Sequence, residues 1–256
     1  MRTNLLGSDV DFLLGPDVLG RMSDRRGRSE RTIVGYHNLH TLYVTRRQPE
    51  IRHFYDKADI IYADGMPLVL WGRFLGLDVT RDHRMTLSSW APEVLTAFRD
   101  RGWRLFYLGA TAEACEKGAA AFREMAPGLE IETRDGFFDA AHGSSDNQAL
   151  LSAIRTFRPD VLMIGMGTPR QERWIIDNLD DLDLPIIWSV GAAIEYFAGT
   201  KARPPAIVGR LGLEWLYRLI SEPRRLWFRY LVEPAYLTPA MIRDLRRRFA
   251  GRSNRA

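Results

Sequence analysis

Short apolar runs alternate with longer amphipathic stretches along most of the chain. The apolar runs have the length of β-strands and occur at residues 31–38, 58–64, 103–110, 129–138, 160–167 and 185–192. Amphipathic stretches of helical length lie between most of them, at residues 66–76, 87–102, 111–128, 145–159 and 169–182. This alternation is typical of βαβ units and predicts an α/β fold, with a Rossmann-like parallel sheet covered by helices on both faces.

The pattern changes near residue 200, where helical segments begin that are interrupted at Pro223, Pro234 and Pro239. From Lys201 onward the chain has 13 Lys and Arg against 4 Asp and Glu, whereas the first 200 residues have 23 against 28. We predict an α/β domain at residues 1–200 and a basic, aromatic-rich helical appendage at residues 201–256. Its apolar residues are too few for an independent core, so we expect it to be loosely attached. Its charge indicates a polyanionic partner: nucleic acid, anionic lipid or phosphate.

The composition is that of a globular protein, with 46% hydrophobic and 27% charged residues among 256. Neither a signal peptide nor a run of about 18 apolar residues occurs, so we expect a chain that does not cross a bilayer. The single cysteine, Cys115, excludes an internal disulfide and a cysteine-based metal site, and it agrees with a reducing cytoplasm.

Glycines occur where the predicted strands end. In open parallel sheets, ligands bind at the carboxyl ends of the strands. Glycine there allows backbone amides to approach an anion, and the helix that follows adds a partial positive charge. Such positions are occupied by Gly65, Gly109, Gly165, Gly167 and Gly191. They predict an anion-binding crevice, although the dinucleotide spacing G-x-G-x-x-G is missing.

The stretch GMGTPRQERWI also carries polar side chains at a strand end. Thr168 is a candidate helix N-cap, Pro169 suits the first helical position, and Gln171 would complete a capping box. The alternative is that Arg170, Gln171 and Glu172 line a ligand crevice. The residues by themselves leave both interpretations open.

Asp64 follows an apolar run and precedes Gly65. As a structural residue it would cap the helix predicted at residues 66–76. As a functional residue, a carboxylate at a strand end can act as a general base. The residues alone do not distinguish between these two interpretations.

No metal site is expected. The histidines show no paired ligand spacing apart from His37 and His40, and the acidic run at residues 180–183 lies at the wrong end of the next strand. That run is predicted to be a solvated loop. The chain has no Walker sequence and no G-x-S-x-G elbow.

Five stretches together resemble one family. They are ADIIYADGMPLV, LFYLGA, DVLMIGMGTPRQERWI, SVGAAIEYFAGTKARPP and GLEWLYRLISEPRRLWFRYL, and in this order they are similar to the WecG/TagA/CpsF glycosyltransferases, glycosyltransferase family 26. The similarity runs from about residue 32 to 232.

The resemblance implies a bacterial, inverting enzyme that moves a sugar from a UDP-sugar to a saccharide on a polyprenyl diphosphate, without a metal or another cofactor. Asp64 would be the catalytic base. The appendage would dock on the anionic inner face of the cell membrane and help to complete the active site, which implies a cytoplasmic, peripheral protein. The resemblance does not specify the oligomeric state, and a homo-oligomer is compatible with it.

The strand-end positions and the resemblance together predict a set of substrate-binding residues. On the body these are Asn38, Gly65, Arg84, Thr86, Gly109, Gly165, Gly167, Thr168, Arg170, Gln171, Glu172 and Gly191. On the appendage at least one arginine is expected to reach a diphosphate, from among Arg210, Arg218, Arg224, Arg225 and Arg229. The arginines beyond the matched stretch are predicted to attract the membrane only: Arg243, Arg246, Arg247 and Arg248.

Two departures from the family pattern leave the donor and acceptor sugars open. Tyr36 stands where the family often has threonine, and RMTLSSW keeps Arg84 and Thr86 but lacks the usual glycine and aspartate. Outside this family, the sequence is compatible with a non-catalytic nucleotide- or nucleic-acid-binding α/β protein. A nicotinamide oxidoreductase is a weaker alternative because the dinucleotide fingerprint is missing. The aromatic and leucine residues of the appendage favour lipid, and no nucleic acid is expected.

Overall fold

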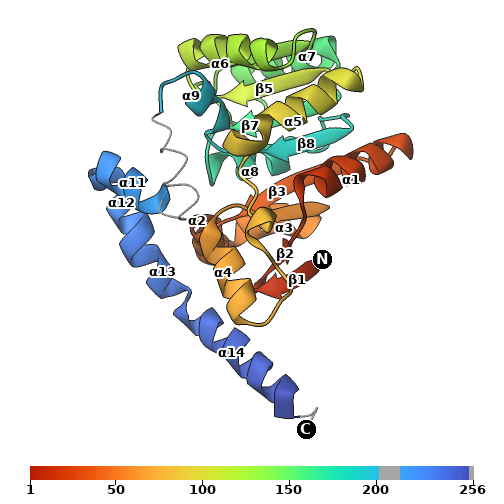
Figure 1. Cartoon of the computed structure of the whole chain (residues 1–256). Helices are drawn as coiled ribbons and strands as arrows, with labels where there is room; N and C mark the ends of the chain where they lie inside the picture. The colour runs from red at the N-terminus through yellow and green to blue at the C-terminus, as the bar shows by residue number, and fades with distance from the viewer. Residues whose placement is uncertain (202–213, 254–256) are drawn as a thin grey trace.

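An eight-stranded sheet forms the centre of the computed structural model, which describes residues 1–201 and 214–253 (Figure 1). The strand order is β1-β2-β4-β3-β8-β7-β5-β6. The strands are Arg2–Leu5 (β1), Ser8–Asp11 (β2), Thr32–His37 (β3), Ile60–Ala63 (β4), Leu105–Gly109 (β5), Ile131–Arg134 (β6), Val161–Gly165 (β7) and Ile186–Ser189 (β8). Neighbouring strands pair in parallel except in the β1–β2 hairpin. The predicted fold class is confirmed.

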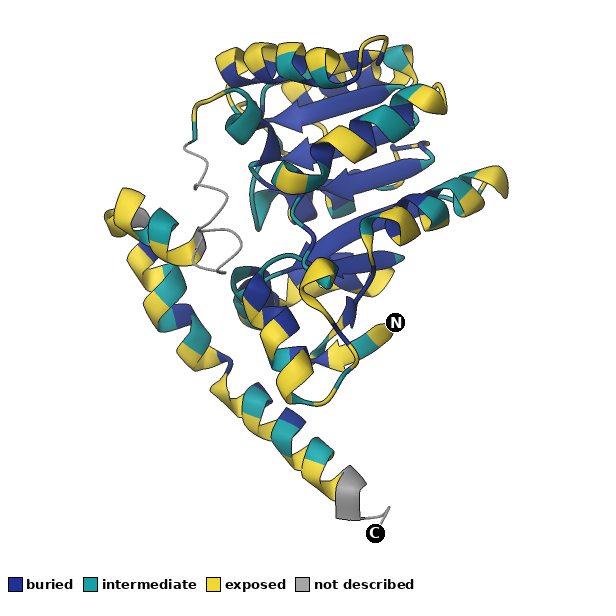
Figure 2. Ribbon diagram, viewed as in Figure 1, coloured by how far each residue is buried: buried dark blue, intermediate teal, exposed yellow. Residues whose placement is uncertain are grey.

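The central strands are covered on both faces because nearly all their residues are apolar. Every residue of β5, β7 and β8 is buried, and these strands are dark blue in Figure 2. Parallel strands present their carboxyl ends at one edge of a sheet. The segments that follow β3, β4, β5, β7 and β8 therefore emerge at the same edge.

Helices cover both faces of the sheet, with their exposed sides outward (Figure 2). One face packs against α1 (Gly15–Gly27), α5 (Leu87–Asp100), α6 (Ala112–Met125) and α9 (Ala193–Phe197). The other packs against α2 (Leu39–Arg47), α3 (Pro49–Lys57), α7 (Ser145–Phe157) and α8 (Arg170–Asp177). The α1 helix, the α2–α3 pair and the N-terminal hairpin have no counterpart among the elements predicted from the sequence.

The appendage runs along one side of the body and continues beyond it (Figure 1). Its described elements are α11 (Glu214–Ser221), α12 (Pro223–Trp227), the π-helical turn η2 (Phe228–Val232), α13 (Glu233–Tyr236) and α14 (Thr238–Ser253). The body adds α4 (Met66–Phe74) and the short η1 (Arg81–His83) near the hairpin. No helix among the described residues combines the length and apolar character that a bilayer span requires.

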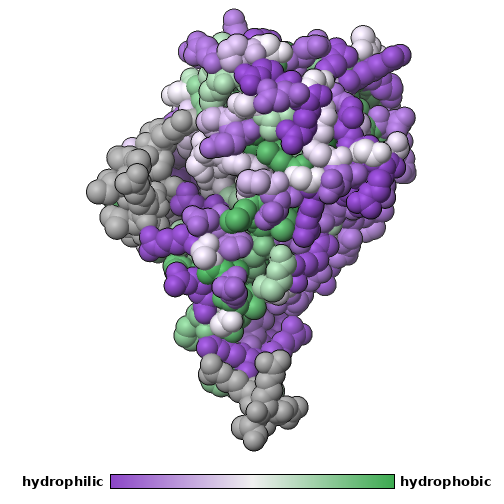
Figure 3. Space-filling view, turned by 45° about the vertical axis from the view of Figure 1, so that its right-hand side comes forward, coloured by the Kyte–Doolittle hydropathy of each residue, from purple (hydrophilic) through white to green (hydrophobic). Residues whose placement is uncertain are grey.

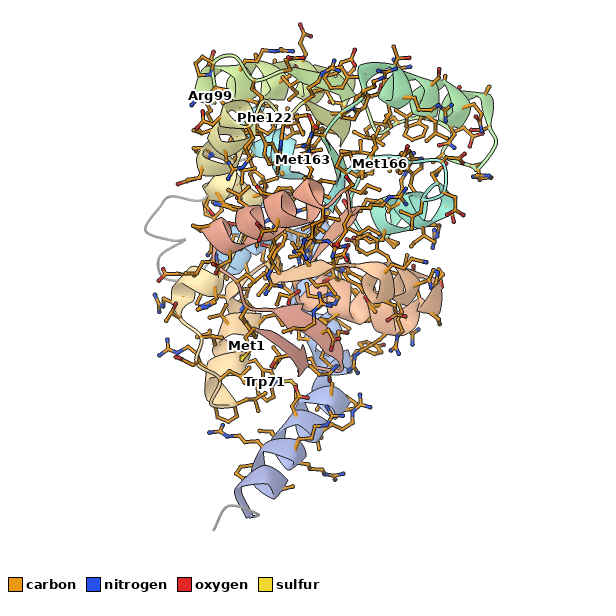
Figure 4. The ribbon with its side chains drawn as sticks, turned by 90° about the vertical axis from the view of Figure 1, so that its right-hand side faces the viewer. Met1, Trp71, Arg99, Phe122, Met163 and Met166 are labelled. Carbon is orange, nitrogen blue, oxygen red and sulfur yellow. The ribbon has the colours of Figure 1, made fainter. Side chains whose placement is uncertain are left out.

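The second half of the appendage is docked on the body through buried contacts. Leu237 and Ala240 belong to the apolar cluster formed by the hairpin and α4. The buried carboxylate of Asp244 accepts hydrogen bonds from the Leu6 amide at 2.8 Å and from Trp71 Nε1 at 3.1 Å. Trp71 lies at the lower end of the body beside α14 in Figure 4. The expectation of a loose attachment is therefore wrong for residues 233–244.

Candidate active site

Asp64 and Asn38 lie side by side because they follow two paired strands. The parallel register of β3 and β4 places His37 opposite Ala63, so the next residue of each strand emerges at the same point. Asn38 caps α2, since its side chain accepts a hydrogen bond from the Thr41 amide. Its Nδ2 atom donates to Asp64 Oδ2 at 3.2 Å. The helix cap therefore also holds the carboxylate in place.

Asp64 is not the cap of the helix that follows it. The N-cap of α4 is Gly65, which adopts a φ of 112° and leaves the helix without a side-chain cap. The Asp64 amide donates to the His37 carbonyl at 2.8 Å, and its carboxylate accepts from Asn38 instead of from α4 amides. The capping interpretation of Asp64 is wrong, and its carboxylate is left at the edge of the sheet, half-buried.

Three arginines act on the Asp64 carboxylate. Burial raises its pKa, and this effect is opposed by the hydrogen bond from Asn38 and by the charges of Arg84, Arg218 and Arg229. Arg84 belongs to the body, whereas Arg218 and Arg229 lie on α11 and η2 of the appendage. Positive charge from two separate parts of the chain thus converges on one carboxylate.

The segment that carries Arg84 and Thr86 is fixed to the end of β4. The Met85 amide, between them, donates to the Ala63 carbonyl at 2.9 Å. The Thr86 hydroxyl forms a hydrogen bond of 2.6 Å with Ser89. These two predicted site residues therefore lie beside Asp64.

A pocket of about 510 Å³ adjoins this segment, between α5, α6 and α9. Ser89 and Tyr196 are among its lining residues. The guanidinium of Arg218 stacks over the Tyr196 ring at 5.9 Å. Tyr196 was not selected from the sequence, although it lies within SVGAAIEYFAGTKARPP, one of the stretches that carry the family resemblance.

The capping box proposed for residues 168–171 is also wrong. The α8 helix begins at Arg170, its N-cap is Pro169, and no side chain caps it. The buried Gln171 side chain instead joins three strand ends. Its Oε1 accepts from the amides of Gly167 at 3.2 Å and Gly191 at 3.1 Å, and its Nε2 faces the Tyr36 hydroxyl at 3.4 Å.

Glu172 is buried next to Gln171. One carboxylate oxygen accepts from Gln171 Nε2 at 2.8 Å and from the Thr168 hydroxyl at 2.9 Å. The other, Oε2, has no hydrogen-bond partner among the described residues. Burial raises the pKa of Glu172, and the hydrogen bonds from Gln171 and Thr168 oppose that shift. Arg170 points elsewhere and donates to the Phe138 carbonyl at 2.9 Å.

Internal packing already requires glycine at three of the strand-end positions. A Cβ atom at Gly165 would collide with the Tyr107 hydroxyl. Gly109 has a φ of 146°, and a Cβ atom there would collide with the backbone of Gly165. Gly191 has a φ of 59°, and a Cβ atom there would lie 2.8 Å from the Tyr36 hydroxyl. The crevice that these glycines predict at the sheet edge remains a prediction.

The remaining appendage arginines are placed differently. Arg224 is exposed on α12. Arg210 and the side chain of Arg225 lie outside the described residues. Arg218 and Arg229 are therefore the members of the predicted set whose charges the structure brings to Asp64.

The two spaced histidines do not form a ligand pair. His37 is buried and stacked on Tyr55 at 4.0 Å, and burial lowers its pKa to about 3. His40 pairs instead with Glu233 of the appendage at 2.7 Å. Within residues 1–201 and 214–253, no three His, Cys, Asp or Glu side chains gather in a metal-binding arrangement. Independence from a metal remains a prediction.

Comparison with known proteins identifies the family. The sequence profile described as "Glycosyl transferase WecG/TagA/CpsF family" matches residues 3–250. Similar proteins include the N-acetylglucosaminyldiphosphoundecaprenol N-acetyl-beta-D-mannosaminyltransferases of Staphylococcus aureus strains MW2 and MRSA252. Each is 27% identical over 206 residues, covering 77% of this chain and 78% of the relative. The chain, with its sheet-edge carboxylate and converging arginines, belongs to the WecG/TagA/CpsF family of glycosyltransferases.

Proposed function

We propose that the protein transfers a sugar, with inversion, from a UDP-sugar to a polyprenyl-diphosphate-linked saccharide in bacterial surface or exopolysaccharide synthesis. The observation that carries the proposal is the Asp64 carboxylate, held by Asn38 and stabilised in its charged form by the charges of Arg84, Arg218 and Arg229. The names of the relatives support a lipid-diphosphate acceptor, because the S. aureus enzymes are named for one.

The proposed reaction is a single displacement. Asp64 removes the proton from the acceptor hydroxyl while that oxygen attacks the anomeric carbon of the donor sugar. The bond between the anomeric carbon and the diphosphate oxygen breaks, and UDP leaves with its additional negative charge. Attack from the face opposite the leaving group inverts the anomeric configuration.

The arginines near Asp64 suit the departing diphosphate. A guanidinium forms paired, charge-assisted hydrogen bonds with phosphate oxygens and stabilises charge that develops as the bond breaks. Gln171 is proposed to position the β7–α8 loop without touching substrate, because both of its polar atoms are used within the protein. Glu172, whose Oε2 has no hydrogen-bond partner in the described part of the chain, is the better candidate for a contact on the donor side.

The lipid chain of the proposed acceptor lies in a membrane, so the proposed reaction takes place at the membrane surface. The appendage exposes large apolar and aromatic side chains, including Trp227, Leu231 and Tyr236. Such side chains settle at a bilayer interface, and arginines attract anionic lipid headgroups. We therefore propose a peripheral association of the appendage with the cytoplasmic face of the membrane, with Arg218 and Arg229 carried toward the acceptor diphosphate.

A turnover assay tests the proposal. The purified chain is incubated with UDP-glucose, UDP-N-acetylglucosamine and UDP-N-acetylmannosamine, each with a synthetic lipid-diphosphate saccharide. Asp64→Asn keeps the size of the side chain and removes the base, so turnover should fall by about 10²–10⁴-fold while donor binding is kept. Near wild-type turnover of this variant would show that Asp64 is not the base. EDTA should leave the wild-type rate unchanged.

Membership in a glycosyltransferase family argues against the two alternatives that the sequence allowed, a non-catalytic nucleotide- or nucleic-acid-binding protein and a nicotinamide oxidoreductase. A liposome-flotation assay run beside an oligonucleotide mobility shift compares the two polyanions directly. Flotation without a shift is the expected result.

A further inference from the structure

A second basic site lies apart from Asp64, where the β1–β2 turn meets α2, α3 and α14. It is a pocket of about 500 Å³. Its lining residues are Asn4, Gly7, Arg46, Arg52, Arg243, Asp244 and Arg247. None of the residues that act on Asp64 is among them. The pocket brings together arginines that lie about 200 positions apart in the sequence.

The positive charge in this pocket is not balanced by carboxylates. Among the described residues that line it, Asp244 is the one carboxylate, against four arginines. Asp244 Oδ2 already accepts from the Leu6 amide and from Trp71 Nε1. Within residues 1–201 and 214–253, no ion pair joins any of the four arginines to an acidic side chain.

Arg46 is held at the pocket by the backbone. Its Nη2 donates to the Leu6 carbonyl at 2.6 Å. Burial and the nearby charges of Arg243 and Arg52 lower its pKa, an effect that Asp244 opposes without reversing it. Gly7, with a φ of 79°, leaves room for this guanidinium, since a Cβ atom there would lie 2.9 Å from Arg46 Nη2. The fold thus keeps a half-buried guanidinium beside other arginines, an arrangement that an anion would stabilise.

We propose that this pocket binds a phosphoryl group. Guanidinium groups form paired hydrogen bonds with phosphate oxygens, and several of them converging on one cavity match the charge of a phosphate or diphosphate better than that of a carboxylate. Asn4, whose Oδ1 accepts from Arg247 at 3.2 Å, helps to orient the outermost arginine.

The phosphoryl group has two sources, a soluble phosphate or diphosphate and a phospholipid headgroup. Phe74 of α4 and Phe249 of α14 are exposed near this end of the molecule, by 56% and 60% of their surface. Figure 3 shows hydrophobic residues gathered on the lower half of the face it displays. Because the same chemistry serves both sources, the experiment has one arm for each.

The test compares single-charge variants of the full chain. Arg52→Gln and Arg243→Gln remove exposed guanidiniums from the pocket, separately and together. Arg155→Gln removes the same charge from an exposed position on α7, outside the pocket and outside the appendage, and is the matched control. Thermal melting of each variant establishes that it folds. One arm titrates pyrophosphate by calorimetry, and the other measures co-flotation with vesicles of phosphatidylglycerol and phosphatidylcholine.

For whichever probe binds the wild-type chain, we expect Arg243→Gln to weaken binding about tenfold or more and Arg155→Gln to change it less than about twofold. Tenfold corresponds to the loss of one charge-assisted hydrogen bond. A variant-specific loss with pyrophosphate supports a soluble ligand, and one seen with anionic vesicles alone supports a lipid headgroup. Equal losses in Arg243→Gln and Arg155→Gln, or an unchanged double variant, would overturn the proposal. So would a wild-type chain that binds neither probe.

Discussion

The pKa of Asp64 is set by opposing influences, and this makes its proposed role measurable. Burial raises the pKa, whereas Asn38 and three arginines lower it. A base works only when deprotonated, so kcat/KM should fall as the pH drops through this pKa. Arg218→Gln removes one of the charges that lower the pKa. The pKa then rises, and the acid limb of the pH–rate profile should move to higher pH.

The matched control for this prediction is Arg246→Gln, because Arg246 does not act on Asp64. It should leave the acid limb where the wild-type chain has it. If Arg218→Gln lowers the rate equally at every pH, the titrating group is not Asp64. The readout therefore separates an electrostatic role of Arg218 from a purely structural one.

Gln171 is predicted to matter for stability. Gln171→Ala leaves the amides of Gly167 and Gly191 without their buried acceptor. The Gly191 amide is buried and the Gly167 amide is half-buried. An unsatisfied buried group costs about 1–3 kcal/mol, so the free energy of unfolding should fall by about that amount. Urea denaturation measures it, with Gln148→Ala on the exposed side of α7 as the control. Equal urea midpoints for both variants would contradict the cross-linking role.

At the scale of elements, the appendage is held by a few buried side chains on otherwise exposed helices. Leu237 is 1% exposed in the apolar cluster of the hairpin and α4, whereas Leu231, in the preceding turn, is 62% exposed. Leu237→Ala should lower the free energy of unfolding by about 2–5 kcal/mol, because it opens a cavity.

The same change at Leu231 is the control and should stay within about 0.5 kcal/mol in solution. Differential scanning calorimetry of both variants makes the comparison. Similar melting temperatures for the two variants would mean that α13 and α14 do not contribute to the cooperative fold. The outcome also decides whether the boundary predicted at residue 200 separates two independent units.

At the scale of the whole molecule, body and appendage share one candidate active site. Truncation after Gly199 removes Arg218 and Arg229 together with the docking helices. We expect turnover to be lost, even with a water-soluble acceptor. We also expect a body that folds with a free energy of unfolding lower by about 3 kcal/mol or more, because a buried leucine and a charged hydrogen bond are removed.

The double variant Arg218→Gln/Arg229→Gln keeps the docking contacts and is the companion to the truncation. It should lose turnover while its urea midpoint stays close to wild type. Full turnover of the truncated chain on the soluble acceptor would leave the appendage with a membrane role alone.

Local pattern was sufficient for the architecture of the body. Runs such as VLMIG are apolar without interruption, and only a strand buried on both faces accommodates that pattern between amphipathic helices. The alternation therefore predicted the parallel sheet and the edge at which Asp64 lies. The N-terminal hairpin was not predicted because its strands have four residues each and carry polar side chains. The α1 helix buries only three residues and has an equally weak pattern.

Partners of individual side chains depended on the tertiary structure. The sequence around Asp64 and around Gln171 was compatible with a helix cap and with a ligand site. The same side-chain atoms can bond either to nearby backbone amides or to groups that are distant in the sequence. The register of β3 and β4 places Asp64 next to Asn38, and the meeting of β3, β7 and β8 brings Gln171 its hydrogen-bond partners, the donor amides of Gly167 and Gly191 and the Tyr36 hydroxyl.

The sequence by itself determined that a basic appendage follows a sheet domain of this family. It did not determine which arginines face Asp64, or that Arg46 and Arg243 share a pocket. Hydrophobic periodicity reports only neighbours along the chain. Contacts between residues some 150–200 positions apart arise from the order of the strands and from the docking of α13 and α14, which only the folded chain defines.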